Sequence, residues 1–92
     1  MNKGDLAVAV AERTGLSKVS ATHAVESVFQ VISEALRQGE EVRILGFGTF
    51  AVGERAGGSG RHPQTGEPID IPASRQPKFK PGQGLKTAVN GW

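Results

Sequence analysis

The sequence predicts an α+β fold in which two N-terminal helices are followed by strands and a short C-terminal helix. Two observations predict this order. Apolar residues recur at helical spacing as far as Gly39, and from Glu41 onward the pattern changes to short β-rich runs separated by glycine and proline. Because 92 residues have room for one domain, we expect a single domain over 1–92, with a helical part at 1–40 and a sheet part at 41–92.

The first helix is expected to begin after Asn2, whose side chain can cap it. Asp5 falls in the opening turn, where a carboxylate complements the positive end of the helix dipole. Gly15 suits the left-handed position that ends many helices. Between these ends, an apolar stripe at i, i+3 and i+4 spacing is formed by Leu6, Ala9 and Val10.

The second helix is expected to begin after Ser17, a second N-cap residue preceded by the apolar Leu16, and to end before Gly39. Its apolar surface is wider than a single stripe. A helix this apolar in so short a chain needs two partners to pack against, for example its own sheet and a second subunit. Its residues expected in the core or in a dimer interface are Val25, Phe29, Ile32 and Leu36.

The sheet part opens with a hairpin, since β-rich runs at 42–45 and 49–52 flank a glycine-rich turn at 46–48. The next segment, 53–74, has few large apolar residues and predicts a long two-stranded ribbon with its tip near 63–66, where Gly66 suits a tight turn. The residues of the sheet part expected in the core or dimer interface are Leu45, Phe47, Phe50 and Phe79.

After the ribbon, residues 75–80 are expected to form a strand with Phe79 facing inward and Lys78 and Lys80 facing outward. Apolar spacing over 85–89 predicts a short last helix. Trp92 is expected in a frayed tail.

Composition excludes several classes of protein. The chain has no cysteine, so neither a disulfide nor a thiolate zinc site is available, and we expect no metal site. An acidic residue appears early, at Asp5, and no long apolar stretch follows it. We therefore expect neither a signal peptide nor a membrane span, no membrane partner, and a cytoplasmic location.

Charge is distributed unevenly along the chain, although the formal net charge is only +2. Residues 1–42 carry four basic and six acidic side chains, whereas 43–92 carry seven basic and three acidic ones. Such an asymmetry indicates a polyanion-binding region in the second half, but ordinary surface charge produces the same pattern.

Several short motifs follow one another at fixed spacing. They are GFGTF at 46–50, ERA at 54–56, GRHPQTGE at 60–67, IPAS at 71–74 and FKPG at 79–82, preceded by NK at 2–3 and GLS at 15–17. In order and spacing these motifs resemble the bacterial histone-like HU/IHF family of DNA-binding proteins, and the length of the chain is closer to HU. The resemblance implies a three-stranded antiparallel sheet with an arm at about 53–74, assembled as an intertwined homodimer.

The resemblance also implies a function. It implies binding of double-stranded DNA, including kinked or nicked duplex, through the minor groove and largely without sequence specificity, with bending and condensation of the DNA in the nucleoid. HU and IHF are themselves standard examples of proteins that insert an apolar wedge between base pairs, and Pro63 occupies the wedge position. The residues that the resemblance places at the DNA are Lys3, Arg55, Arg61, His62, Pro63, Gln64, Arg75, Lys78, Lys80 and Lys86.

The residues themselves leave two roles open. Pro63 is equally suited to a plain turn, and His62 either donates to a base edge or phosphate or makes no contact. The chain also lacks cations that the family usually carries in the arm, at the positions of Gly53, Gly58 and Ser59. Fewer cations predict fewer phosphate contacts and a shallower salt dependence, and extra glycines raise the entropy cost of ordering the arm.

Two other classes of function compete with DNA binding. The glycines at 57–60 resemble a phosphate-binding loop, but they lead into Arg61 and not into a helix, and His23 and His62 have no evident partners for acid or base chemistry. We therefore expect no catalysis, no cofactor and no small-molecule substrate. The alternative is a structural or protein-interaction dimer with weakened DNA binding, which salt-dependent duplex binding distinguishes from the main prediction.

Overall fold

The computed structural model describes residues 1–61 and 64–92. Its first element is a helix with a capped N-terminus. In α1 (Lys3–Thr14) the Asn2 side chain accepts the Asp5 N–H at 2.9 Å, and the Asp5 carboxylate accepts the Asn2 N–H at 3.1 Å. This reciprocal capping box satisfies two backbone donors that a helix otherwise leaves free. Gly15, at φ 74°, ends the helix as the sequence predicts.

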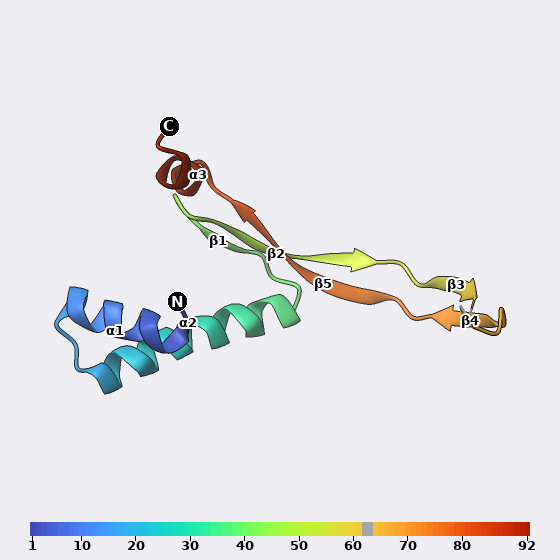
Figure 1. Ribbon diagram of the computed structural model, residues 1–92, viewed down its shortest axis with the longest axis horizontal. Coiled ribbons are helices and arrows are strands. Elements are labelled where there is room, and N and C mark those ends of the chain that lie inside the picture. Colours follow the sequence, from blue (N-terminus) through green and yellow to red (C-terminus); the bar gives the residue numbers. More distant parts are fainter. Residues whose placement is uncertain (62–63) are drawn as a thin grey trace.

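The second helix, α2 (Lys18–Arg37), is capped by Ser17, whose side chain accepts a backbone N–H of the first turn. It packs against α1 over its N-terminal half, and the two helices lie antiparallel beside each other (Figure 1). The two small residues Ala7 and Ala21 are buried between them, together with Val25. Both predicted N-caps and the two predicted helices are therefore confirmed.

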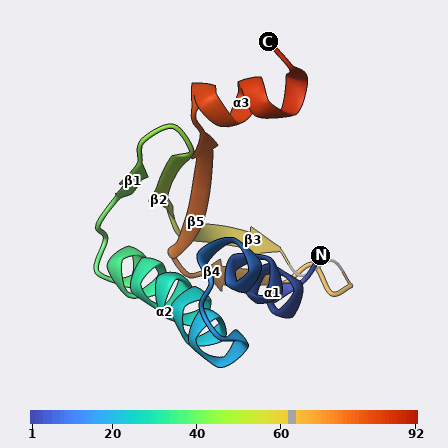
Figure 2. The same cartoon turned by 90° about the vertical axis from the view of Figure 1, so that its left-hand side faces the viewer.

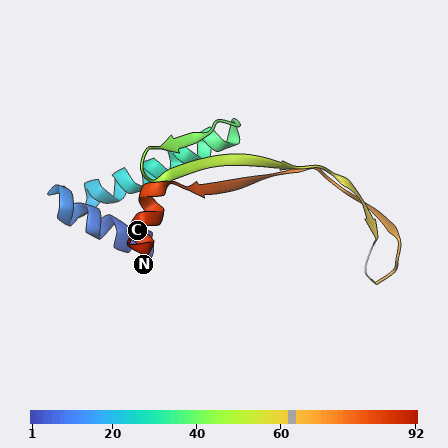
Figure 3. The ribbon, with the colours of Figure 1, turned by 90° about the horizontal axis from the view of Figure 1, so that it is seen from above.

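Three antiparallel strands form the sheet, and two shorter strands extend it. The sheet has the order β1 (Val42–Ile44), β2 (Gly48–Arg55) and β5 (Ser74–Pro81). Beyond it, β3 (Gly58–Arg61) pairs with β4 (Pro68–Ile71) and continues the two-stranded ribbon, which leaves the body of the molecule as a thin arm (Figure 3). The short helix α3 (Gln83–Asn90) lies at the end of the sheet away from this arm (Figure 1). The predicted fold class is confirmed.

The turn between β1 and β2 corrects one prediction. The first strand ends at Ile44, whose carbonyl accepts the Phe47 N–H at 3.0 Å and so closes a tight turn in which Gly46 has φ 81°. Leu45 lies in this turn and is 98 % exposed. The strand therefore ends one residue before the predicted bound of 45, because the turn begins earlier than the apolar run suggests. Leu45 is not in the core of the single chain, and its place in a dimer interface stays a prediction.

An aromatic cluster joins the sheet to the turn. The Phe79 ring lies 4.8 Å from that of Phe50 and 5.6 Å from that of Phe47, measured between centroids. The rings are tilted against each other, a favourable arrangement for aromatic pairs. Gly48 leaves room for this cluster, since a Cβ there would lie 2.6 Å from the Phe79 ring.

The chain by itself covers little of its apolar surface. Ile32, Leu36 and Phe50 are half-buried, but Phe29 is 44 % exposed, and Phe47 and Phe79 are exposed to a similar degree. The radius of gyration is 19.1 Å, against about 12 Å for a compact chain of this length. The chain exposes 7430 Å², whereas a folded monomer of its mass exposes about 5,100 Å².

In the described part of the chain, none of the helices combines the length and the apolar character that crossing a bilayer requires.

The exposed apolar surface generates a prediction about assembly. If a second copy covers it, unfolding is coupled to dissociation, and the thermal midpoint rises with protein concentration by about 4 °C for each tenfold increase. Differential scanning calorimetry over two decades of concentration measures this shift. A concentration-independent midpoint, together with a folded monomer in sedimentation at micromolar concentration, would contradict the prediction.

Candidate nucleic-acid interface

The ribbon formed by β2 and β5 has two chemically different faces. Residues directly opposite each other in an antiparallel pair share a face, and successive residues alternate between faces. Phe50 pairs with Phe79, and Val52 with Pro77, whereas Thr49 pairs with Lys80. We call the face of the phenylalanines the inner face and the other the outer face. The outer face consists of Arg43, Thr49, Ala51, Gly53, Arg55, Ser74, Gln76, Lys78 and Lys80.

The inner face is turned toward α2. One hollow, of about 360 Å³, is lined by residues 27, 28, 31 and 32 of α2 and by Val42 and Ile44 of β1. A second, of about 260 Å³, is lined by Ser33, Leu36 and Arg37 of α2 and by inner-face residues of the ribbon. Figure 2 shows α2 lying on one side of the sheet. The outer face is therefore the one that α2 does not cover.

Four cations lie on the outer face, and none of its described residues is acidic. Lys78 and Lys80 come from β5, Arg55 from β2, and Arg43 from β1, where it pairs with Thr49. Arg43 lies 3.8 Å from Glu41, but both side chains are mostly exposed, so this ion pair is weak. An uncompensated row of cations on an open surface can bind a polyanion such as a nucleic-acid backbone.

Arg43 is a further candidate that was not among the site residues predicted from the sequence. The alternation of Val42, Arg43 and Ile44 predicts that Arg43 points away from the apolar face, but only the pairing of β1 with β2 places it on the same surface as Lys80. The only indication of this role in the sequence was the alternation of apolar and basic residues over 42–44, which is a short pattern.

Arg75 lies on the inner face, apart from the outer-face cations. It pairs with Glu54 across the ribbon, and its Nη1 donates to the Arg37 carbonyl at 2.9 Å. That carbonyl is in the last turn of α2, where backbone acceptors lack helical partners and a cation is favoured by the helix dipole. In this structure Arg75 ties the base of the ribbon to α2.

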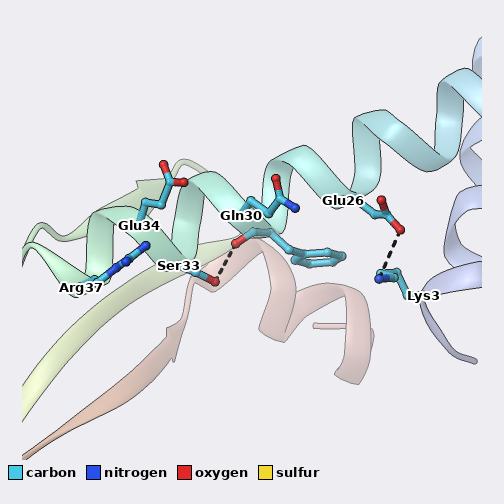
Figure 4. A pocket seen from close by; sticks show the side chains of 7 residues that line it. Lys3, Glu26, Gln30, Ser33, Glu34 and Arg37 are labelled. Carbon is cyan, nitrogen blue, oxygen red and sulfur yellow. Dashed lines mark hydrogen bonds and ion pairs between the residues drawn. The ribbon is translucent and has the colours of Figure 1, made fainter.

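Other predicted site residues are distributed over the body and the arm. Lys3 forms an ion pair with Glu26 at 3.3 Å, beside a hollow of about 480 Å³ that Phe29 also lines (Figure 4). Lys86 is exposed on α3, and Gln64 is exposed in the turn of the arm. Arg61 ends β3, opposite Pro68. His62 and Pro63 lie outside the described residues.

The arm beyond the base of the ribbon carries little positive charge. Residues 53–74 contain Arg55 and Arg61 but three acidic residues, Glu54, Glu67 and Asp70. Pairing is interrupted between β2 and β3 and again between β4 and β5, and Gly66, at φ 71°, supports the predicted turn. Three of the four outer-face cations, Arg43, Lys78 and Lys80, therefore lie before the arm, at the base of the ribbon, and Arg55 lies where the arm begins.

Residues 1–61 and 64–92 contain no group of three or more histidine, aspartate or glutamate side chains placed to hold a metal ion. The arrangement supports binding by charge and shape.

Comparison with known proteins identifies similar chains. The model of the family described as bacterial DNA-binding protein matches residues 1–90. DNA-binding protein HU of Geobacillus stearothermophilus is 60 % identical over 89 residues, which is 97 % of this chain and 99 % of the relative. DNA-binding protein HU 1 of Bacillus subtilis is 56 % identical over 91 residues, 99 % of both chains.

Solved structures resemble the chain over nearly its whole length. A cocrystal structure of Anabaena HU with DNA superposes with a TM-score of 0.86 at 39 % identity and covers 98 % of both chains. HU from Thermotoga maritima superposes with a TM-score of 0.68 at 32 % identity, covering 98 % of this chain and 100 % of that one.

The position of Arg75 generates a prediction about stability. Arg75→Met removes the donor to the Arg37 carbonyl and should lower the free energy of unfolding by about 1 kcal/mol. The matched control is Lys78→Met, on the outer face of the same strand, which should change it by less than about 0.5 kcal/mol. Urea unfolding of both variants measures the difference. Equal stabilities would show that the Arg75 hydrogen bond contributes nothing.

Proposed function

Because the chain belongs to the bacterial DNA-binding protein family, we propose that it binds double-stranded DNA through the minor groove, largely without sequence specificity, and bends and condenses it. The observation that carries this proposal is the outer face of the ribbon, with four cations and no acidic residue among its described members. Such a face contacts phosphates of any sequence, because the phosphate backbone carries no base information.

The similar Anabaena structure is a complex with DNA and supports the proposal. We propose that Arg43, Arg55, Lys78 and Lys80 contact phosphates from the outer face of the ribbon. Lys3 and Lys86 extend this contact on the body, on α1 and α3. In the arm, Arg61, His62 and Gln64 reach into the minor groove, and Pro63 inserts as the wedge.

A single arm cannot enclose a duplex, so the proposal includes a homodimer. The chain exposes about 2,300 Å² more than a compact monomer of its mass, and part of this excess is the apolar surface around Phe29 and Phe47. An obligate dimer interface buries an area of this order. We assign residues 1–40 the main part in dimer formation and 41–92 the contact with DNA.

The proposal places the protein in the cytoplasm, on the DNA of the nucleoid. Its work requires no catalytic step, since affinity and bending come from charge and shape. The matched relatives are named as DNA-binding proteins and not as enzymes, which agrees with this view.

One observation favours the alternative of a structural or protein-interaction dimer. The arm contains one more acidic than basic residue, which weakens its attraction to DNA. We prefer DNA binding because the outer-face cations lie largely at the base of the ribbon, where the acidic residues of the arm do not neutralise them.

Salt dependence tests the proposal directly. If each dimer displaces counterions from roughly five to nine phosphates, log affinity should fall with log salt at a slope of about −4 to −8. Arg55→Ala or Lys80→Ala should weaken binding to all duplexes alike and flatten the slope by about 1 per contact removed. Arg13→Ala, in the last turn of α1, is the matched control and should leave the slope unchanged.

Fluorescence anisotropy across a salt series, with intact, nicked and scrambled duplexes, measures these slopes. Absence of duplex binding at low salt would favour the protein-interaction dimer. Binding with unchanged slopes in both variants would remove Arg55 and Lys80 from the interface.

The wedge generates a separate prediction about bending. Pro63 has no charge and no backbone donor, so its contribution to DNA binding must come from shape and apolar contact with a base step. Pro63→Ala should therefore reduce the bend more than the affinity for straight duplex, and it should shrink the preference for nicked DNA, which is already easy to kink. The control is Pro72→Ala, which is also in the arm but outside the strands.

Energy transfer between the ends of a labelled duplex at saturating protein measures the bend. An unchanged bend with lower affinity would show that Pro63 is a turn residue.

A further inference from the structure

The side chain of Lys78 lies across Gly53 on the outer face of the ribbon. A Cβ atom placed on Gly53 would lie 2.5 Å from the Lys78 Cε, 2.8 Å from its Nζ and 3.1 Å from its Cδ. The first two distances are shorter than real Cβ atoms show, so the end of the lysine occupies the space that a side chain at position 53 would need.

The register of the ribbon explains how Lys78 reaches this place. Lys78 pairs with Ala51, and Gly53 pairs with Gln76, so Lys78 and Gly53 are diagonal neighbours on one face. Ala51 and Gly53 have the two smallest side chains available, which leaves a flat surface along β2. Because β2 runs outward, the lysine leans toward the arm and toward Arg55.

The charge of Lys78 is uncompensated there. None of the described outer-face residues is acidic, and Glu54 points to the inner face, opposite Arg75. The stem of a lysine packed along a surface has also lost rotamer freedom before any ligand arrives, which lowers the entropy cost of binding.

We propose that Gly53 is the seat of the Lys78 ammonium group and that this seat holds the charge in place for a backbone phosphate of DNA. The proposal rests on the proposed function and deepens it. Gly53 acts as a positioning residue and does not contact the ligand. Lys78 belongs to β5, but its ammonium group lies over Gly53 of β2, which has no side chain of its own. The cationic row then runs without a gap from Lys80 through Lys78 to Arg55.

A double-mutant cycle tests the seat. Gly53→Ala adds one methyl group that must displace the end of a flexible side chain, so the fold should tolerate it. Gly53 is not among the glycines with positive φ, and alanine is preferred to glycine inside a strand, so the thermal midpoint should not fall. Gly53→Ala should nevertheless flatten the salt slope of duplex binding by up to about 1 per displaced contact, and Lys78→Ala should have the same effect.

The decisive measurement is the coupling between the two positions. In the Lys78→Ala background, Gly53→Ala should have no further effect on affinity or slope, because no ammonium group remains to displace. The matched control is Gly58→Ala, at which a Cβ would meet nothing within 4 Å, and whose effect should be the same with Lys78 or with Ala at 78. Salt-dependent anisotropy of the parent, the single variants and both double variants completes the cycle.

Two outcomes would overturn the seat while leaving DNA binding intact. If Gly53→Ala weakens binding equally in both backgrounds, the methyl group obstructs DNA directly. If Gly53→Ala leaves the slope unchanged, Lys78 finds the phosphate without the seat. If instead the parent protein shows no salt-dependent duplex binding, the proposed function itself fails.

Discussion

The rest of the structure depends on the antiparallel pairing of β2 with β5. Eight consecutive pairs, from Gly48 with Pro81 to Arg55 with Ser74, sort the side chains of both strands onto two faces. A shift of β5 by one residue would turn Lys78 and Lys80 toward α2 and Phe79 toward solvent. A single register therefore puts the residues that pack against α2 on one side of the two strands and the cations on the other side.

The two ends of the ribbon have different physical properties. At its base, β1 and α2 support the ribbon, Arg75 bonds to the end of the helix, and the cations are concentrated. Toward the tip only two strands remain, glycines are frequent, and the net charge is close to zero. Because an isolated two-stranded ribbon is marginally stable in water, the paired strands β3 and β4 have less support than the base of the ribbon.

The incomplete core has a related consequence. Few large side chains are buried by the chain itself, and the aromatic cluster at the sheet remains partly open. A second copy would close this surface and bring a second arm into place in the same step. Under the proposed function, stability and the shape that holds a duplex thus depend on the same contact between subunits.

The sequence by itself determined the features that depend on neighbours a few residues apart. Asn2, Ser17 and Gly15 set helix ends through local hydrogen bonds and φ angles, and the period of two identified the strands and the outward lysines. The pattern over 53–74 predicted the ribbon, and the family motifs added the expectation of a wedge at Pro63, which lies outside the described residues. Tertiary structure alone decided the bond from Arg75 to the Arg37 carbonyl, the place of Arg43 on the same face as Lys80, the exposure of Leu45 and the reach of Lys78 over Gly53. Most of these features depend on which residues of different strands and helices come into contact. The residue pattern along one strand does not contain that information.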